Sequence, residues 1–141
     1  MIIKNELSEQ IKEKIFKGFS EQAIQCTGID GLSEKPISFE IYHTGELAGV
    51  IVVQLFWEQL HIKYLFVKEN MRGQGLGRQL LQHALEFGKK RQCAFAFVET
   101  MNFQALEFYK KMGFILNFSR TGYAKNTSFN YLQMPLFDKG T

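Results

Sequence analysis

The chain has 141 residues, of which 45% are hydrophobic and 22% are charged, and its formal net charge is +3. This length and balance fit one folded domain with a sizeable core. The small charge and the lack of a long Lys or Arg run argue against a nucleic-acid-binding protein. The N-terminus lacks the apolar core of a signal peptide and no stretch approaches a membrane span, so we expect a cytoplasmic protein without a membrane partner.

The cysteines and histidines give no metal motif. Cys26 and Cys93 are the only cysteines, and their wide spacing predicts neither a disulfide framework nor a metal site. His43 and His83 have no second ligand at metal spacing, so we interpret them as surface residues. The sequence therefore predicts no bound metal.

The first part of the chain predicts a helix followed by a hairpin. Apolar residues recur at helical spacing over residues 8–26, with Ser8 placed as the cap. Residues 37–43 and 47–57 have strand character, and residues 44–46 between them fit a hairpin turn.

The segment 60–67, which follows a tight turn at Glu58 and Gln59, predicts a strand with an irregularity. Leu60 and Ile62 alternate with polar residues, but Leu65, Phe66 and Val67 are all apolar. Burial of both faces would explain this pattern. A β-bulge, which inserts one residue and frees backbone N–H groups, would explain it equally.

The rest of the chain alternates helices with strands. We expect a helix from Leu76 to Gly88 or to the basic cluster 89–91, a strand over 93–99, a helix over 103–112 that Gly113 ends, and strands over 114–118 and 129–136. Strands before, between and after the helices predict an α/β (α+β) fold. Its mixed sheet carries helices on both faces, within one domain of residues 1–141.

The segment from Tyr64 to Arg78 is typical of an anion site. A strand-like run passes into glycines at 73, 75 and 77, and an amphipathic helix pattern follows at once. Glycine lets the backbone turn sharply and lie close to a ligand. The first turn of the helix leaves N–H groups unpaired at the positive end of its dipole, which favours a phosphate or pyrophosphate.

Two common phosphate-binding loops do not fit this turn. A dinucleotide fingerprint that starts at Gly73 needs a third glycine at position 78, which is Arg78. A P-loop needs Gly-Lys followed by Ser or Thr, which occurs nowhere in the chain. The remaining pattern is Arg72-Gly-Gln-Gly-Leu-Gly77.

This pattern resembles the coenzyme-binding loop of the GNAT (GCN5-related N-acetyltransferase) superfamily. A second segment, from Asn102 through Ala105 and Tyr109 to Gly113 and Phe114, is similar to that family's Asn-x-x-Ala-x-x-Phe/Leu-Tyr-x-x-x-Gly-Phe helix. The resemblance covers about residues 45–136, is strongest over 64–114, and points to a bacterial branch whose substrates are mostly unassigned. It implies a mostly antiparallel sheet and acetyl-CoA as the cosubstrate.

The resemblance also implies a set of cofactor-binding residues. They are Leu65, Phe66, Val67, Arg72, Gly73, Gln74, Gly75, Leu76, Gly77, Arg78, Asn102 and Phe108. The glycine turn would hold the pyrophosphate, and the strand before it would pair with the pantetheine amides. The alternatives are that both arginines are solvated surface groups and that Asn102 is a helix N-cap.

The implied reaction is direct attack of a neutral amine on the acetyl thioester. Tyr109 is the expected proton donor to the leaving thiolate, since a phenol with a pKa of about 10 can protonate a thiolate whose thiol has a pKa of about 8.5. The alternative is that Tyr109 is a core aromatic. Glu99 is our choice of general base, with Glu58, His61 and Glu69 as other candidates. A backbone N–H near Phe66 or Val67 is expected to stabilise the oxyanion.

We therefore expect an acetyltransferase that acts on a small-molecule amine or a peptide amine. An acyl-CoA-binding sensor or partner domain without turnover is the alternative. A different phosphate-ligand protein that reuses the glycine turn is a third. The resemblance also makes a homodimer a possible assembly.

Overall fold

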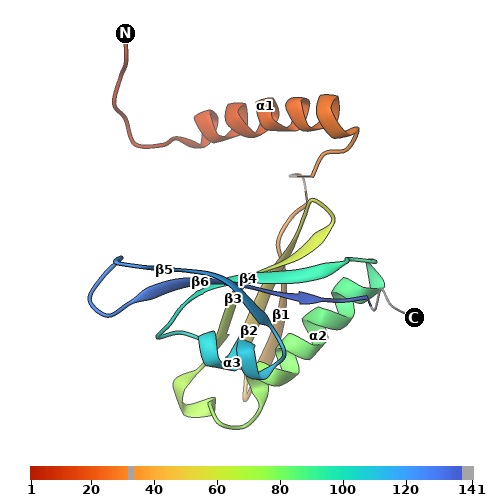
Figure 1. The fold of residues 1–141 in the computed structure, drawn as a ribbon, viewed down its shortest axis with the longest axis vertical. Coiled ribbons are helices and arrows are strands. Elements are labelled where there is room, and N and C mark those ends of the chain that lie inside the picture. Colours follow the sequence, from red (N-terminus) through yellow and green to blue (C-terminus); the bar gives the residue numbers. More distant parts are fainter. Residues whose placement is uncertain (32–33, 138–141) are drawn as a thin grey trace. The chain divides into compact units, whose positions relative to one another are not determined.

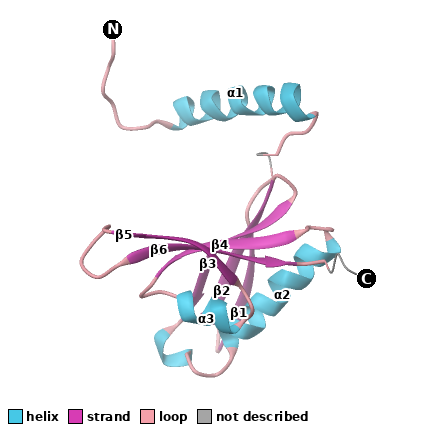
Figure 2. Cartoon of the chain, viewed as in Figure 1, coloured by secondary structure: helices cyan, strands magenta, loops and turns pink. Residues whose placement is uncertain are grey.

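The computed structural model describes residues 1–31 and 34–137. The chain separates into two compact units, Met1–Glu34 and Lys35–Thr141. Its elements are α1 (Glu9–Thr27), β1 (Ile37–His43), β2 (Glu46–Phe56), β3 (Gln59–Val67), η1 (Glu69–Met71), α2 (Leu76–Lys90), β4 (Phe95–Met101), α3 (Leu106–Lys111), β5 (Ile115–Thr121) and β6 (Ser128–Pro135). Figure 2 shows these helices and strands along the chain.

The first unit consists of α1 and its flanking segments. The N–H of Ile11 donates to Ser8 Oγ at 3.1 Å, which confirms Ser8 as the N-cap. The helix ends at Gly28, whose φ of 81° is the left-handed conformation that glycine adopts without strain. Ser20 Oγ donates to Asp30 Oδ1 at 3.2 Å, which holds the segment after the helix against its last turns.

The second unit contains one six-stranded sheet in the order β1-β2-β3-β4-β6-β5. All neighbouring pairs are antiparallel except β3 and β4, which are parallel. The predicted mixed, mostly antiparallel sheet is thus confirmed. In Figure 1, α2 runs along the sheet, and the chain reaches α2 from β3 through η1 and the glycine turn.

The core lies between the sheet and the helices α2 and α3. Leu60 and Ile62 of β3 pack with Leu81 of α2 and with Tyr109 and Phe114 at α3, all in one cluster of buried residues. Both helices of this unit therefore share one face of the sheet. The prediction of helices on both faces stays a prediction for the other face.

Several predicted boundaries were wrong by a few residues. The turn before β3 is formed by Trp57 and Glu58, which both have positive φ, rather than by Glu58 and Gln59. Helix α2 ends at Lys90, inside the basic cluster, which was one of its two predicted ends. Gly88 therefore lies within the helix, where an added Cβ would be only 2.9 Å from Leu60 Cδ2. Strand β4 begins two residues later than predicted, at Phe95.

Helix α3 is shorter at its start than the sequence predicts. The residues before it form turns in which Thr100 Oγ1 accepts the N–H of Ala105 at 3.3 Å and Gln104 Oε1 accepts the N–H of Met101 at 3.0 Å. These hydrogen bonds hold the residues between β4 and α3 in turns, and α3 begins only at Leu106.

The irregularity in β3 is a β-bulge. Val52 of β2 pairs with Tyr64 and Val53 pairs with Ile62, so Lys63 is the extra residue. Phe66 is 51% exposed, which rules out burial of both faces. The sequence placed the bulge near Phe66 or Val67, whereas the structure has it at Lys63. Lys63 gave no sign of a bulge, since it fits the regular alternation from Leu60 to Tyr64.

Candidate functional site

A cavity opens where β3 and β4 separate. The two strands pair only between Leu60–Ile62 and Ala96–Val98. Beyond these residues a cavity of about 230 Å³ lies between them, and its lining includes Leu65, Phe66, Glu99 and Tyr109. The bulge at Lys63 bends β3 at the same point. The structure thus brings two predicted cofactor-binding residues and both predicted catalytic residues to one cavity.

Among the residues that the structure describes, no strand pairs with the edge of β3 that faces this cavity. Since β4 pairs with β3 only as far as Ile62, the segment from Tyr64 to Val67 is paired only on its β2 side. Backbone N–H and C=O groups on the cavity side can therefore bind an extended ligand like an added strand. The role of an N–H near Phe66 or Val67 in oxyanion binding stays a prediction.

The glycine turn joins β3 to α2 through two left-handed residues. Gly73 has a φ of 80° and Gly75 a φ of 81°, and Gly75 is the N-cap of α2. Helix α2 begins at Leu76, and no side chain in the described part of the chain caps it. Its first N–H groups are therefore available to an anion.

The two arginines of the turn have different surroundings. Arg72 Nε donates to the carbonyl oxygen of Val67 at 3.0 Å, so this guanidinium ties the turn to the end of β3. Arg78 and Gln74 are exposed. Arg72 is thus more than a solvated group, and its remaining N–H groups stay available to a phosphate.

Gly77 connects the turn to α3. A Cβ at this position would lie 3.7 Å from the Phe108 ring and 3.8 Å from Val67 Cγ2. The predicted cofactor-binding residues Val67, Gly77 and Phe108 are therefore neighbours. They lie between the turn and the cavity lining, where Tyr109 follows Phe108 on α3.

Tyr109 is both a core aromatic and a lining residue of the cavity. Its side chain is almost fully buried, with 2% of the residue exposed, and its ring meets those of Phe108 and Phe114 edge-on at 5.3 and 5.2 Å. Burial raises the pKa of the Tyr109 phenol well above its ordinary value. The raised pKa favours the protonated phenol near pH 7, and the role of Tyr109 as proton donor stays a prediction.

Glu99 is the acid that lines the cavity, and its carboxylate has a histidine neighbour. Glu99 Oε1 lies 3.5 Å from His61 Nε2. Glu58 lies in the turn before β3 and Glu69 in η1, and neither lines the cavity. Of the four candidate bases, the geometry favours Glu99, with His61 beside it.

Asn102 does not cap a helix, although a helix N-cap was the alternative interpretation of this residue. The N-cap of α3 is Ala105, so the N-cap interpretation of Asn102 was wrong. Instead Asn102 Nδ2 donates to the carbonyl oxygen of Asn126 at 3.2 Å, and Asn102 Oδ1 accepts the N–H of Ser128 at 3.0 Å. Asn102 thus ties the end of β4 to the start of β6. Its contact with pantetheine stays a prediction.

Six lining residues of the cavity were not predicted as site residues. They are Lys63, Tyr64, Val98, Thr100, Gln104 and Ala105. The carbonyl oxygen of Thr100 accepts a hydrogen bond at 3.1 Å from Asn130 Nδ2, and Asn130 is itself buried. A polar residue at the end of an apolar strand, as Thr100 is, was the available signal.

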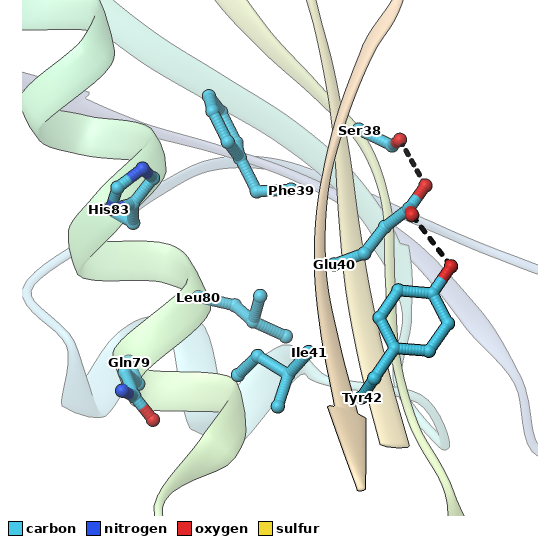
Figure 3. A pocket seen from close by; sticks show the side chains of 8 residues that line it. All are labelled: Ser38, Phe39, Glu40, Ile41, Tyr42, Gln79, Leu80 and His83. Carbon is cyan, nitrogen blue, oxygen red and sulfur yellow. Dashed lines mark hydrogen bonds between the residues drawn. The ribbon is translucent and has the colours of Figure 1, made fainter. Parts of the chain in front are cut away.

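A second cavity of about 450 Å³ lies between β1 and α2. Figure 3 shows Phe39 and Ile41 of β1 facing Leu80 and His83 of α2. On the other side of the strand, Glu40 accepts hydrogen bonds from two neighbouring hydroxyls, those of Ser38 and Tyr42. The lining of this cavity contains no predicted cofactor-binding or catalytic residue.

Two kinds of feature are absent from residues 1–31 and 34–137. No three His, Cys, Asp or Glu side chains gather there as a metal site would need. No helix in the same residues is both long and apolar enough to cross a bilayer.

A family model identifies the class of protein to which this fold and site belong. The model of the acetyltransferase (GNAT) family matches residues 7–114, which is more than half of the chain. The chain belongs to this family.

A curated relative agrees with this membership, and two solved acetyltransferases share the fold. Blasticidin-S acetyltransferase of Streptomyces morookaense is 40% identical over 88 residues, which cover 55% of this chain and 62% of the relative. An acetyltransferase from Bacillus cereus ATCC 14579 has a TM-score of 0.78 at 24% identity and covers 94% of this chain and 97% of its own. A streptothricin-type acetyltransferase of Bacillus anthracis, solved with acetyl coenzyme A, has a TM-score of 0.65 at 20% identity and covers 74% and 65%.

The curated relatives are longer than the part this chain matches. The chain spans 62% of the length of blasticidin-S acetyltransferase and only 39% of another curated relative.

Proposed function

We propose that this protein transfers an acetyl group from acetyl-CoA to a primary amine of a small molecule or peptide. The amine attacks the thioester directly while both substrates are bound. The observation that carries the proposal is the cavity between the diverging strands β3 and β4, which has Tyr109 and Glu99 in its lining. The relative solved with acetyl coenzyme A supports the choice of cosubstrate.

In this proposal the coenzyme lies along one path from the glycine turn to the cavity. Its pyrophosphate accepts hydrogen bonds from the N–H groups of residues 73–78, with Arg72, Gln74 and Arg78 at the rim. Its pantetheine pairs with Leu65 and Val67 and passes Phe108 and Asn102. The thioester then lies in the cavity beside Tyr109.

The proposed reaction moves protons between the acceptor amine, Glu99, Tyr109 and the leaving sulfur. Glu99 removes one proton from the acceptor ammonium, and the free amine adds to the thioester carbonyl. As the tetrahedral intermediate collapses, the C–S bond breaks and Tyr109 donates its proton to the leaving sulfur. The second proton of the attacking nitrogen restores the phenol. The raised pKa of Tyr109 disfavours a free phenolate, so donation and recovery of the proton are closely coupled.

The family match supports treating the chain as one functional domain of residues 1–141. It extends over residues 7–114 and so crosses the boundary between the two compact units. A cytoplasmic location and a homodimer stay predictions. Size-exclusion chromatography with light scattering measures the assembly directly.

An amine-panel assay with acetyl-CoA and mass detection of products tests the proposal. The panel includes blasticidin S, small aliphatic and aromatic amines, and lysine-containing peptides. We expect at least one acetylated product together with release of free thiol. Thiol release without an acetylated product, or no release with any amine, would contradict acetyl transfer.

A thermal-shift measurement separates the proposal from its alternatives. Acetyl-CoA at a hundred times its dissociation constant should add about 2.7 kcal/mol to the free energy of unfolding, which corresponds to several degrees in Tm. A shift without any turnover favours an acyl-CoA-binding sensor domain. A shift with simple nucleotides but not with CoA favours a different phosphate-ligand protein.

A further inference from the structure

His61 and Glu99 form a side-chain pair on neighbouring strands. His61 of β3 lies opposite Phe97 of β4 in the parallel pairing, and Glu99 follows two residues later on the same face. His61 Nε2 lies 3.5 Å from Glu99 Oε1, and their side chains are 20% and 38% exposed. Glu99 lines the cavity while His61 does not, so the imidazole contacts the carboxylate from outside the reaction space.

A stack of rings holds the imidazole in place. The His61 ring lies parallel to the Phe97 ring, with centroids 4.5 Å apart and an angle of 4° between the planes. Phe97 in turn stacks on Tyr131 of β6 at 5.9 Å. Because the imidazole is held flat against Phe97, few rotations remain that move Nε2 away from Glu99.

The surroundings of His61 keep the imidazole neutral near pH 7. Burial lowers its pKa, the Glu99 carboxylate raises it, and Lys63 lowers it. Lys63 Nζ donates to Gln54 Oε1 on β2 at 3.1 Å. On the β6 side, burial and then Glu99 raise the pKa of Tyr131, so that phenol stays neutral. His61 is therefore a neutral base whose carboxylate neighbour stabilises the protonated imidazolium.

We propose that His61 is a positioning residue that receives the proton which Glu99 removes from the acceptor ammonium. This inference rests on the proposed acetyl transfer. The ammonium N–H bond breaks as the Glu99 O–H bond forms, and the proton then passes to His61 Nε2 and on to solvent. Glu99 returns to its charged form before the next acceptor binds, and the stack on Phe97 keeps the two groups together.

The pH dependence of His61→Phe tests this relay. Phenylalanine preserves the ring stack but cannot accept a proton. We expect kcat/KM to fall about tenfold near pH 7, while the affinity for acetyl-CoA is unchanged. The deficit should shrink toward pH 10, where the acceptor amine loses its proton unaided, and also at acid pH, where His61 of the parent protein is already protonated.

Further variants distinguish the relay from a structural role. His61→Asn keeps a polar contact with Glu99 but does not titrate, so it should lose as much activity as His61→Phe. In a Glu99→Gln background, His61→Phe should cause no further loss. His83→Phe is the matched control. His83 lies on α2, its ring centroid is 4.7 Å from that of Phe39, and it does not line the cavity between β3 and β4. His83→Phe should leave the pH profile unchanged.

The possible failures are distinguishable. A deficit in His61→Phe that is equal at every pH, full activity in His61→Asn, or an unchanged profile in both variants would overturn the relay while acetyl transfer stands. If the parent protein acetylates no amine although it binds acetyl-CoA, the proposed function fails first and the relay fails with it.

Discussion

The two ends of the proposed coenzyme path are built from different parts of the chain. At the glycine turn the groups offered to the ligand are mostly backbone N–H groups, and most of the side chains there are exposed. At the cavity the groups are side chains, and Tyr109 is almost completely buried. The difference teaches that affinity should depend on backbone conformation at one end, whereas turnover should depend on individual atoms at the other.

The largest expected effect is at the cavity end. Tyr109→Phe removes one oxygen from a ring that otherwise keeps its contacts with Phe108 and Phe114. We expect kcat to fall by about 10²-fold or more, since general-acid catalysis contributes at least this much. Steady-state kinetics measures turnover, and calorimetric titration should give an unchanged Kd for acetyl-CoA.

The matched control for this change is Tyr42→Phe. Tyr42 donates a hydrogen bond to Glu40 on β1 and lines the other cavity, so its loss should leave kcat unaltered. Equal turnover in Tyr109→Phe and the parent protein would show that the phenol is only a packing residue.

The next effect is at the glycine turn and concerns affinity. Gly75→Ala puts a Cβ on a residue with a φ of 81°. The left-handed conformation costs a non-glycine residue about 1 kcal/mol, so the turn should relax and present its N–H groups poorly. We expect Kd for acetyl-CoA to rise about tenfold, measured by calorimetric titration, with a small fall in Tm.

Gly45→Ala separates strain from binding. Gly45 in the β1–β2 turn has the same φ of 81° and likewise no atom within 4 Å of an added Cβ. Gly45→Ala should therefore lower Tm by about as much as Gly75→Ala does, without changing the Kd for acetyl-CoA. If both variants bind acetyl-CoA as the parent protein does, the glycine turn is not the pyrophosphate site.

The smallest effect belongs to the exposed arginine of the turn. Arg78→Gln removes one charge near the proposed pyrophosphate, while Arg72 keeps its hydrogen bond to Val67. Exposed charges are screened by salt, so we expect Kd to rise only about threefold at low salt and less at high salt. If Arg78→Gln and the parent protein have the same Kd at low salt and also at high salt, Arg78 is excluded from ligand contact.

The sequence predicted the local conformation of the glycine turn, because the spacing of Gly73, Gly75 and Gly77 before an amphipathic helix depends on local contacts alone. The structure has left-handed conformations at Gly73 and Gly75 and starts α2 at Leu76. Binding of a pyrophosphate by this turn stays a prediction. The β-bulge was foreseen as one of two explanations but placed near Phe66 rather than at Lys63. Its position depends on the pairing with β2, which is a long-range contact.

The pairing of His61 with Glu99 could not be predicted for the same reason. The two residues are far apart in the chain, and only the parallel alignment of β3 with β4 brings them to 3.5 Å. The N-cap alternative for Asn102 was wrong for a similar reason, because its partners Asn126 and Ser128 lie beyond the next helix and strand. A tertiary contact holds the side chain that local propensity would place at a cap.

A crystal structure of the protein with coenzyme A tests the central claim most directly. We predict that the diphosphate accepts hydrogen bonds from N–H groups between Gly73 and Arg78, and that the sulfur lies in the cavity near the Tyr109 hydroxyl. A diphosphate bound away from the N-terminus of α2, or a coenzyme that leaves the space between β3 and β4 empty, would contradict this account.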